Sequence, residues 1–228
     1  DAVLTVVHLL YATGHAAPSG DELVRDELTR RALDLAKVLH QLLPEEREVA
    51  GLLALLLVHE SRRTTRTDAE GRLLRLDEQD RSQWDHDLWV EADELIVRSL
   101  RAGPPGRFTL QAAIGALHAE AESYEQTDWD QILVLYDELL RVWPSRVVAL
   151  NRAVVLAEVE GPEAALAVVE ELEADGRLAG YRYLPATRAD LLRRLGRHDE
   201  AVIAYERALA LTENAAERSY LLARLDPD

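Results

Sequence analysis

A histidine followed by a glutamate, His59-Glu60, is the pair in this sequence that most resembles a catalytic metal motif, the start of a zinc metalloprotease helix. Such a site needs a second histidine four positions after the first, so that both imidazoles lie on one helical face. That position is occupied by Arg63. His118 and Glu120 are two positions apart, so they point in different directions on a helix. We therefore expect no metal site.

Paired carboxylates could support a different chemistry, acid–base catalysis of the kind that cleaves glycosidic bonds. The acids that lie close together in the sequence are Asp77, Glu78, Asp80, Asp85 and Asp87. Helix capping and pairing with arginine explain these side chains without any reaction. The sequence has no glycine-rich phosphate loop and no Gly-x-Ser-x-Gly nucleophile motif. We expect no catalytic residue, no cofactor and no enzymatic activity.

Arginines are concentrated between positions 62 and 81, where six arginines face five acids, a net charge of +1 in a chain whose formal net charge is −16. Arginine forms bidentate, geometrically fixed pairs with carboxylates. In one interpretation, Arg62, Arg63 and Asp80 pair internally and hold the segment on the core. In the other, the segment is a recognition surface or a ligand pocket. Both interpretations remain open at this stage.

The same segment interrupts the helical pattern of the chain. Thr64–Thr67 and Arg72–Leu76 flank the sequence Asp-Ala-Glu-Gly, which suits a turn with Gly71 at positive φ. We predict a short hairpin or an ordered loop here.

The candidate protein-interaction residues are polar or aromatic side chains of this segment and of two later helices. They are Arg62, Arg63, Arg66, Gln79, Asp80, Arg81, Trp84, Asp85, His118, Asn151 and Arg152. For Trp84 and His118 the alternative is a packing role in the core. Asn151 and Arg152 could line the groove of a helical repeat and clamp a bound peptide, or they could make structural hydrogen bonds within the array.

A repeated stripe indicates the elements that position these residues. Its members share one helical face, with spacings of four and three: Ala32/Ala36/Leu39, Ala92/Ile96/Ser99, Ile132/Tyr136/Leu139, Ala165/Val169/Leu172 and Ala201/Tyr205/Ala208. In the first three copies a proline follows at five positions and ends the helix (Pro44, Pro104 and Pro144). This pattern is typical of the second helix of a tetratricopeptide (TPR) repeat.

Five helix pairs and a final capping helix follow from these signals. The pairs are 2–12 with 21–43, 46–63 with 84–101, 108–121 with 128–142, 146–160 with 162–174, and 182–195 with 198–211, and the last helix is 214–225. Capping boxes at Ser19–Glu22 and Ser82–Asp85 are predicted to start two of the helices. The fold class is therefore an all-α solenoid of about five TPR-like hairpins, with an irregular insertion near 62–83.

The predicted organisation has an irregular N-terminal half, residues 1–106, and more regular repeats from 107 to 228, with one continuous solenoid as the alternative. A Gly-Pro-Pro-Gly turn that begins at Gly103 marks the boundary. The apolar run Gly51–Val58 is too short to span a bilayer, and no signal peptide is evident, so we expect a cytoplasmic protein. Without cysteine, disulfides and thiolate chemistry are excluded. Without methionine, we expect the chain to be a piece of a longer protein.

Several segments together resemble the C-terminal extension of a family of extracytoplasmic-function (ECF) sigma factors. They are His59–Arg63, Glu78–Asp85, Phe108–Ile114 with His118-Ala119, Thr127–Trp129, Pro144-Ser145, Leu150–Val154 and Gly161-Pro162. The similarity runs from about Leu10 to the C-terminus. One departure is Arg146, where the family usually has a second proline.

This resemblance implies that two helical promoter-reading domains would precede Asp1, and that residues 1–12 would be the tail of the connection to them. The chain itself would regulate sigma-factor activity through RNA polymerase core or through the promoter-binding domains of the same protein. A surface this acidic repels phosphate backbones, so we expect no direct contact with nucleic acid. The alternative is a stand-alone TPR-like peptide-binding adaptor unrelated to transcription.

Overall fold

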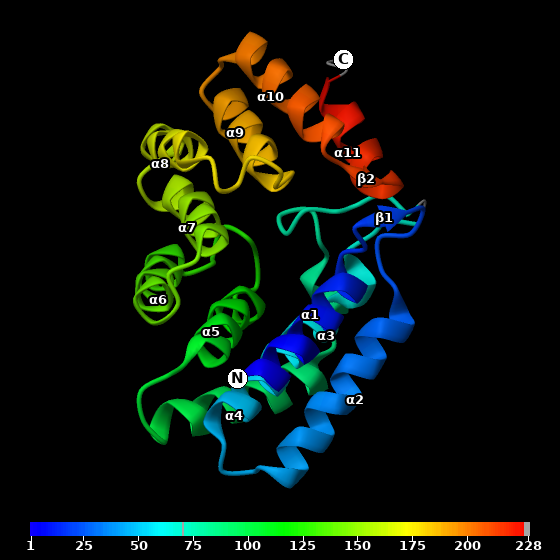
Figure 1. The fold of residues 1–228 in the computed structure, drawn as a ribbon, viewed down its shortest axis with the longest axis vertical. Helices are drawn as coiled ribbons and strands as arrows, with labels where there is room; N and C mark the ends of the chain where they lie inside the picture. The colour runs from blue at the N-terminus through cyan, green and yellow to red at the C-terminus, as the bar shows by residue number, and fades with distance from the viewer. Residues whose placement is uncertain (70, 226–228) are drawn as a thin grey trace. The chain divides into compact units, whose positions relative to one another are not determined.

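The computed structural model describes residues 1–69 and 71–225, and this part of the chain contains eleven α-helices. The predicted all-α fold of TPR-like hairpins is confirmed (Figure 1). The chain divides into two compact units, Asp1–Asp128 and Trp129–Asp228. The predicted boundary at residue 106 concerned the regularity of the repeats and stays a prediction.

The first unit holds five α-helices among its described residues. They are α1 (Ala2–His15), α2 (Asp26–Leu42), α3 (Arg47–Ser61), α4 (His86–Arg101) and α5 (Arg107–Glu120), with the short strand β1 (Ser19–Gly20) and the 3-10 turns η1 (Arg63–Thr65) and η2 (Arg81–Gln83). The second unit contains α6 (Trp129–Val142), α7 (Arg146–Val159), α8 (Pro162–Asp175), α9 (Tyr183–Arg194), α10 (His198–Ala210), the short strand β2 (Glu213–Asn214) and α11 (Ala215–Leu225).

The repeated stripe is buried, as its spacing predicts. Only Leu39 and Tyr136 of its members keep partial exposure, while the small residues Ala32, Ala92 and Ala165 have none. Small residues at the contact face allow neighbouring helices to approach closely, and larger neighbours fill the space around them. The proline-marked helices α2, α4 and α6 end at Leu42, Arg101 and Val142, each two or three residues before its proline.

Both predicted capping boxes are wrong. Helix α2 begins at Asp26, because backbone hydrogen bonds from Arg25 N to Gly14 O (2.7 Å) and from Ala17 N to Leu23 O (2.8 Å) first hold the chain against the end of α1. Helix α4 is capped by Asp85, whose carboxylate accepts from Leu88 N at 3.1 Å. Ser82 lies instead in η2, and the extended backbone of Trp84 separates it from the helix.

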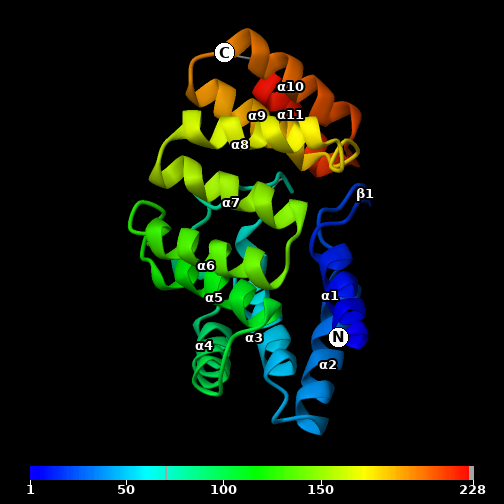
Figure 2. The same ribbon diagram turned by 60° about the vertical axis from the view of Figure 1, so that its left-hand side comes forward.

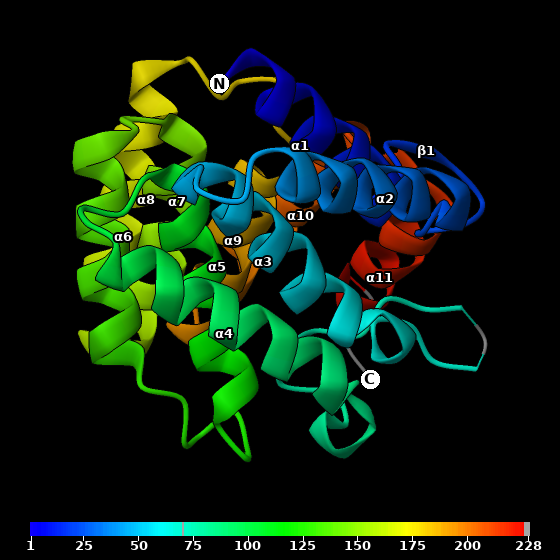
Figure 3. The same cartoon turned by 90° about the horizontal axis from the view of Figure 1, so that it is seen from below.

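Helix α3 is the centre of the first unit. Its residues from Val49 to Val58 are all buried, and it packs against α1, α2, α4 and α5. Figure 3 shows α3 between α2 and α4. A helix that is apolar around its whole circumference must be surrounded by other elements. The apolar run that is too short for a membrane therefore forms the core around which the other four helices are arranged.

Helices α3 and α5 approach so closely that glycine is required at the contact. A Cβ atom on Gly51 would lie 2.4 Å from Thr109 Oγ1 and 2.7 Å from Thr109 N. On the opposite helix, a Cβ atom on Gly115 would lie 2.7 Å from a methyl carbon of Val58. Backbone atoms cannot move aside as a flexible side chain can, so the Gly51 position accepts no side chain without a shift of α5.

The same contact caps α5. The carboxylate of Glu48, in the first turn of α3, accepts hydrogen bonds from Phe108 N at 3.0 Å, Thr109 N at 3.3 Å and Thr109 Oγ1 at 3.0 Å. The first amides of a helix have no partner within the helix, and a negative charge beside them is favourable. Glu48 thus supplies from a different helix the cap that α5 lacks in its own sequence, where Gly106 is the N-cap residue.

In the second unit each helix packs on the next one in the chain, from α6 through to α11. Figure 2 shows α6, α7 and α8 stacked in sequence order. The shared core is made of small and aliphatic side chains, including Leu150, Val169, Leu192 and Ala208. This serial packing of helices, without a closed bundle, is the defining arrangement of a solenoid.

A buried ion pair joins α11 to the start of α9. Glu217, 5% exposed, accepts from Arg182 Nε at 2.7 Å and Nη2 at 3.1 Å, and also from the Tyr183 hydroxyl. Burial is the main cause that raises the pKa of Tyr183, and the Glu217 carboxylate raises it further. Asn214 caps α11 through Ala216 N at 3.0 Å. These polar contacts fix the last helix over the open end of the array.

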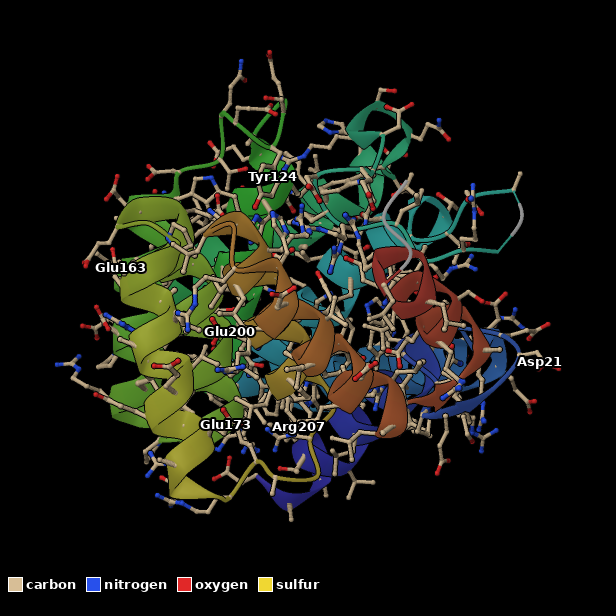
Figure 4. All side chains as sticks on the ribbon, turned by 90° about the horizontal axis from the view of Figure 1, so that it is seen from above. Asp21, Tyr124, Glu163, Glu173, Glu200 and Arg207 are labelled. Carbon is tan, nitrogen blue, oxygen red and sulfur yellow. The ribbon has the colours of Figure 1, made fainter. Side chains whose placement is uncertain are left out.

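The outer face of this unit carries more exposed ion pairs. Glu173 on α8 meets Arg207 on α10, and Glu200 pairs with Arg197 at 2.7 Å (Figure 4). Exposed pairs of this kind contribute little to stability, because water and salt screen them. The stability of the array therefore rests mainly on its core.

We predict that Gly51→Ala destabilises the protein by about 2 kcal/mol, because overpacking a tight helix contact typically costs about 1–3 kcal/mol. Urea unfolding followed by circular dichroism measures this change. The matched control is Gly180→Ala, since a Cβ atom there meets nothing within 4 Å. Equal stability of the two variants would contradict the close contact between α3 and α5.

A second prediction concerns the buried pair. Glu217→Gln is expected to lower the free energy of unfolding by about 3 kcal/mol, because it leaves the Arg182 charge buried without its counter-ion. The control is Glu138→Gln, whose partner Arg141 has a side chain 73% exposed, for which we expect a loss below about 1 kcal/mol. Indistinguishable losses would show that burial does not strengthen the Arg182–Glu217 interaction.

Candidate functional site

The candidate site is the segment between α3 and α4, residues 62–85, together with the parts of α1, α3 and α5 on which it lies. The hairpin expected here is present in minimal form: Thr67 and Leu73 form one antiparallel bridge, and Gly71 has φ of +79°. Glu70, part of the predicted turn, lies outside the described residues. Thr64 and Thr65 belong to η1 and not to a strand, so the extended arm is shorter than predicted.

Arg81 fastens this segment to the end of α5. Its guanidinium donates to His118 O at 2.7 Å, to Ala121 O at 2.8 Å and to Thr127 Oγ1 at 3.3 Å. The last carbonyls of a helix have no partner within the helix, and a cation is favoured beside them. Arg81 therefore completes the C-terminus of α5 and, through the same bonds, sets the position of the segment.

Trp84 and Asp85 close the base of the segment. The Trp84 indole N–H donates to Thr65 Oγ1 at 2.9 Å, and the Asp85 amide donates to Ser61 O at 2.7 Å. The Arg81 guanidinium lies 5.4 Å from the centre of the Trp84 ring. The two hydrogen bonds of Trp84 and Asp85 join the two ends of the segment and give the loop a fixed base.

Asp80 and Gln79 stabilise the turn locally. The Asp80 carboxylate accepts from Ser82 Oγ at 2.6 Å and from Gln83 Nε2 at 2.8 Å, and these hydrogen bonds lower the pKa of Asp80. The Gln79 amide donates to Leu74 O at 3.1 Å. These two side chains, predicted as candidates for recognising a partner, thus organise the conformation of the loop.

Arg63 ties the segment to α2. Its guanidinium contacts Glu60 at 2.7 Å and Asp26 at 3.0 Å. Burial lowers the pKa of Arg63, but the two carboxylates outweigh it, so the net shift is upward. The internal pairing expected of Arg63 is therefore present, although its partners lie outside the segment.

Arg62 and Arg66 have a different environment. Arg66, only 9% exposed, donates to the carbonyl of His15 at the end of α1. Arg62 contacts the ring of His59 at 3.5 Å, from Nη2 to Nδ1. Burial lowers the pKa of Arg62; the Tyr11 hydroxyl partly opposes this, and the charge of Arg81 adds to it. Arg62 does not form the predicted ion pair with a carboxylate anywhere in residues 1–69 and 71–225.

A group of aromatic and imidazole rings lies beside these arginines. The ring centres of Tyr11 and His15 are 5.4 Å apart, and those of His15 and His59 are 5.0 Å apart. The Tyr11 hydroxyl donates to Glu60 at 3.3 Å. We call Tyr11, His15, His59, Arg62, Arg66, Arg81 and His118 the arginine–histidine cluster. Its members come from α1, α3, α5 and the segment 62–85.

The imidazoles of this cluster are held in the neutral form. Burial lowers the pKa of His118 to about 3, and the charges of Arg62 and Arg81 lower it further. Burial also sets the pKa of His59 and of His15 well below the usual value, with additional effects from Arg62 and Arg66. At neutral pH the positive charge of the cluster is therefore carried by its arginines.

From the sequence, His59 was considered only as a metal ligand, and two further members of the cluster, Tyr11 and His15, were missed. They are four residues apart on α1, so both lie on one helical face. That spacing was a visible signal, but it is equally typical of an ordinary packed face. Only the contact that Arg66 makes with the end of α1 distinguishes it.

Asn151 and Arg152 belong to α7 in the second unit. Arg152 pairs with Asp137 on α6 at 2.6 Å, while Asn151 is exposed. The Arg152–Asp137 pair is a tie between consecutive helices of the array. Whether the two residues also hold a peptide stays a prediction.

The described residues offer little for metal chemistry or membrane insertion. No three of their His, Asp and Glu side chains are grouped so that they could hold a metal ion. Within residues 1–69 and 71–225, no helix combines the length and apolar character that a bilayer crossing needs.

The geometry defines a TPR-like helical-repeat protein with an anchored loop inserted between α3 and α4. A solved structure, that of TTC0263, a thermophilic TPR protein of Thermus thermophilus, superposes with a TM-score of 0.64 at 20% identity, over 97% of this chain and 96% of that one. At this identity the likeness shows the fold alone. It confirms the all-α solenoid.

The sequence relatives are less informative about activity. Residues 1–100 match the model of a family of unknown function, DUF6596. The chain is 46% identical over 225 residues to the uncharacterized protein R00370 of Rhizobium meliloti (strain 1021). This match covers 99% of the chain but 53% of the relative, so the chain spans about half the length of the curated relative.

The neutral imidazoles predict an acid-sensitive fold. A histidine whose pKa is lower in the folded state than in the unfolded chain binds its proton preferentially in the unfolded chain. It therefore does not reduce the free energy of unfolding above about pH 6.5, and it reduces it progressively as the pH falls toward the pKa of the folded state. Replacing His118 by Gln should reduce the stability lost between about pH 6 and pH 5 by about 1 kcal/mol. Urea unfolding at both pH values measures this difference.

The control for this prediction is His198→Gln, because His198 is exposed on α10. We expect this variant to follow the wild-type pH dependence. If His118→Gln also follows the wild-type curve, His118 titrates alike in the folded and unfolded chain, and its desolvation in the cluster is disproved.

Proposed function

We propose that this chain is a protein-interaction module that regulates transcription initiation, as the C-terminal extension of an ECF-type sigma factor. The observation that carries the proposal is the anchored loop 62–85 within an array of TPR-like hairpins. Ordering each residue of an irregular segment costs about 1–2 kcal/mol of backbone entropy. The contacts of Arg81, Trp84 and Arg63 already order the loop in the free protein. We infer that the loop is therefore preorganised for recognition, so that binding would not have to order it.

The fold supports an interaction role. Arrays of helical hairpins have extended faces on which a polypeptide can lie, and their concave side chains supply the polar contacts. In the first unit the anchored loop supplies a polar surface. In the second unit Asn151 and Arg152 on α7 supply another. We assign no catalytic role to any of these residues, because their contacts are those of anchors and helix ties.

Two observations support the sigma-factor assignment. The segments 59–63, 78–85 and 108–119 resemble the extension of these sigma factors in residue type and order. The Rhizobium relative is about twice as long as this chain, which leaves room for two promoter-reading domains. With a formal net charge of −16, the chain itself would be repelled by DNA. Its partner is therefore RNA polymerase core or the promoter-binding domains of the same protein, in the cytoplasm.

The proposal is tested with the full-length protein that contains this chain, in run-off transcription with purified RNA polymerase core. Removing residues 1–228 should change promoter-dependent output by about tenfold, within the range of typical coupling free energies. Arg81→Ala should reproduce part of that change, because it releases the loop from the end of α5. Circular dichroism of the variant verifies that the helices remain folded.

The matched control is Arg141→Ala, which removes one exposed arginine from α6 in the second unit. It should leave transcription unchanged. Unaltered output after truncation would eliminate a regulatory role for the chain. If the full-length protein directs no transcription with any polymerase core, the chain is instead a peptide-binding adaptor outside transcription.

A further inference from the structure

The charge balance of the arginine–histidine cluster is unusual for a protein interior. Three guanidinium groups, those of Arg62, Arg66 and Arg81, come together in the first unit, and backbone carbonyls are prominent among the acceptors of Arg66 and Arg81. The nearby carboxylate of Glu60 is engaged by Arg63 at 2.7 Å and by the Tyr11 hydroxyl. Glu60 is thus already paired, in a chain whose 42 acidic residues outnumber its 26 basic ones.

The imbalance of charge is most evident at the guanidinium of Arg62. The hydrogen-bond contact of this guanidinium within the described ranges is the 3.5 Å approach to His59 Nδ1, at the limit of a hydrogen bond. Neutral imidazole cannot balance a cation. Burying a charge without a counter-ion costs several kcal/mol, and proteins ordinarily avoid it by pairing.

The effect of this unbalanced charge extends to the surrounding rings. Arg62 contributes to lowering the pKa of His15, His59 and His118, which lie on three different helices. As whole residues, the three histidines and Arg62 nevertheless keep partial exposure to solvent, although Nδ1 of His15 and Nδ1 of His118 are buried. The cluster is thus desolvated enough to strengthen electrostatic interactions, while each of these residues keeps some exposed surface.

We propose that Arg62 is the centre of a binding site for one oxyanion group, a carboxylate or a phosphate. A guanidinium presents a planar fork of N–H donors that matches two oxygens of such a group. His59 lies beside the fork, and its ring can supply a further hydrogen bond. Arg81 and Arg66 add positive charge but are held by the carbonyls of α5 and α1, so their positions are fixed before the anion arrives.

The oxyanion can come from a free small molecule or from an acidic side chain of a bound polypeptide. This inference goes beyond the proposed function, because it needs neither RNA polymerase nor a promoter. It also predicts an inverted stability effect. Removing an anchoring arginine destabilises a fold, whereas removing a desolvated cation with no counter-ion leaves stability unchanged or raises it.

The test uses the purified chain at low ionic strength, titrated calorimetrically with sodium phosphate in one arm and with a capped hexaglutamate peptide in the other. Sodium chloride at matched ionic strength corrects for screening. We expect saturable one-to-one binding of at least one probe and a rise in the unfolding temperature with that probe. Binding of phosphate alone identifies a free anion as the source, and binding of the peptide alone identifies a polypeptide.

The variants separate an anion site from a structural arginine. Arg62→Gln should weaken binding by about tenfold or more, the loss expected for charge-assisted hydrogen bonds. Arg62→Lys, which keeps the charge without the fork, should weaken it less. Arg141→Gln removes an equal charge from the exposed face of α6 and should bind as wild type. Without ligand, Arg62→Gln should unfold at the wild-type temperature or above it.

Each contrary result overturns the proposal. Failure of both probes to bind would show that the cluster takes no oxyanion. Wild-type affinity in Arg62→Gln would place any binding elsewhere. An unfolding temperature of Arg62→Gln well below that of the wild type would identify Arg62 as a structural anchor. None of these results depends on the transcription assay, so the two proposals fail separately.

Discussion

The close contact between α3 and α5 is the constraint on which the first unit depends. Gly51 allows the backbone at Thr109 to lie directly against α3, and Glu48 then reaches the free amides at the start of α5. The contact is both steric and electrostatic, because the close approach of α3 and α5 leaves no void between them and gives the first amides of α5 a hydrogen-bond acceptor. Since α3 also packs against α1, α2 and α4, the contact with α3 positions α5 relative to the rest of the unit.

The loop and the arginine–histidine cluster follow from that placement. Arg81 can hold the segment 62–85 only where the last carbonyls of α5 are available, and Arg66 only where α1 ends. Arg63 meets α2 at Asp26. The cations that anchor the loop are thereby gathered in one place, with Arg62 among them. Because arginines anchor the loop, their positive charges lie close together. The oxygen atoms that accept hydrogen bonds from Arg63, Arg66 and Arg81 do not accept one from Arg62.

The helices were largely predictable, and the site was only partly so. Stripe residues such as Ala36 and Ala165 are recognised by spacing, because a helical face repeats within a few residues of sequence. The turn contacts of Asp80 and Gln79 could not be specified from the sequence, since these hydrogen bonds are local but depend on the exact backbone path, and a recognition role for the two residues stays a prediction. The start of α2 was misplaced because backbone hydrogen bonds from Arg25 and Ala17 override the capping pattern at Ser19.

The sequence by itself determined the all-α class, the helix order, the proline-marked helix ends and the turn at Gly71, because each depends on neighbours within one or two helical turns. Tertiary structure alone decided that Tyr11, His15, His59, Arg62 and His118 come together, since they are separated by up to 107 positions along the chain. It also decided that the Arg62 guanidinium contacts His59 and no carboxylate among the described residues. Ion pairing and desolvation act between elements, and so they depend on packing that no local pattern specifies.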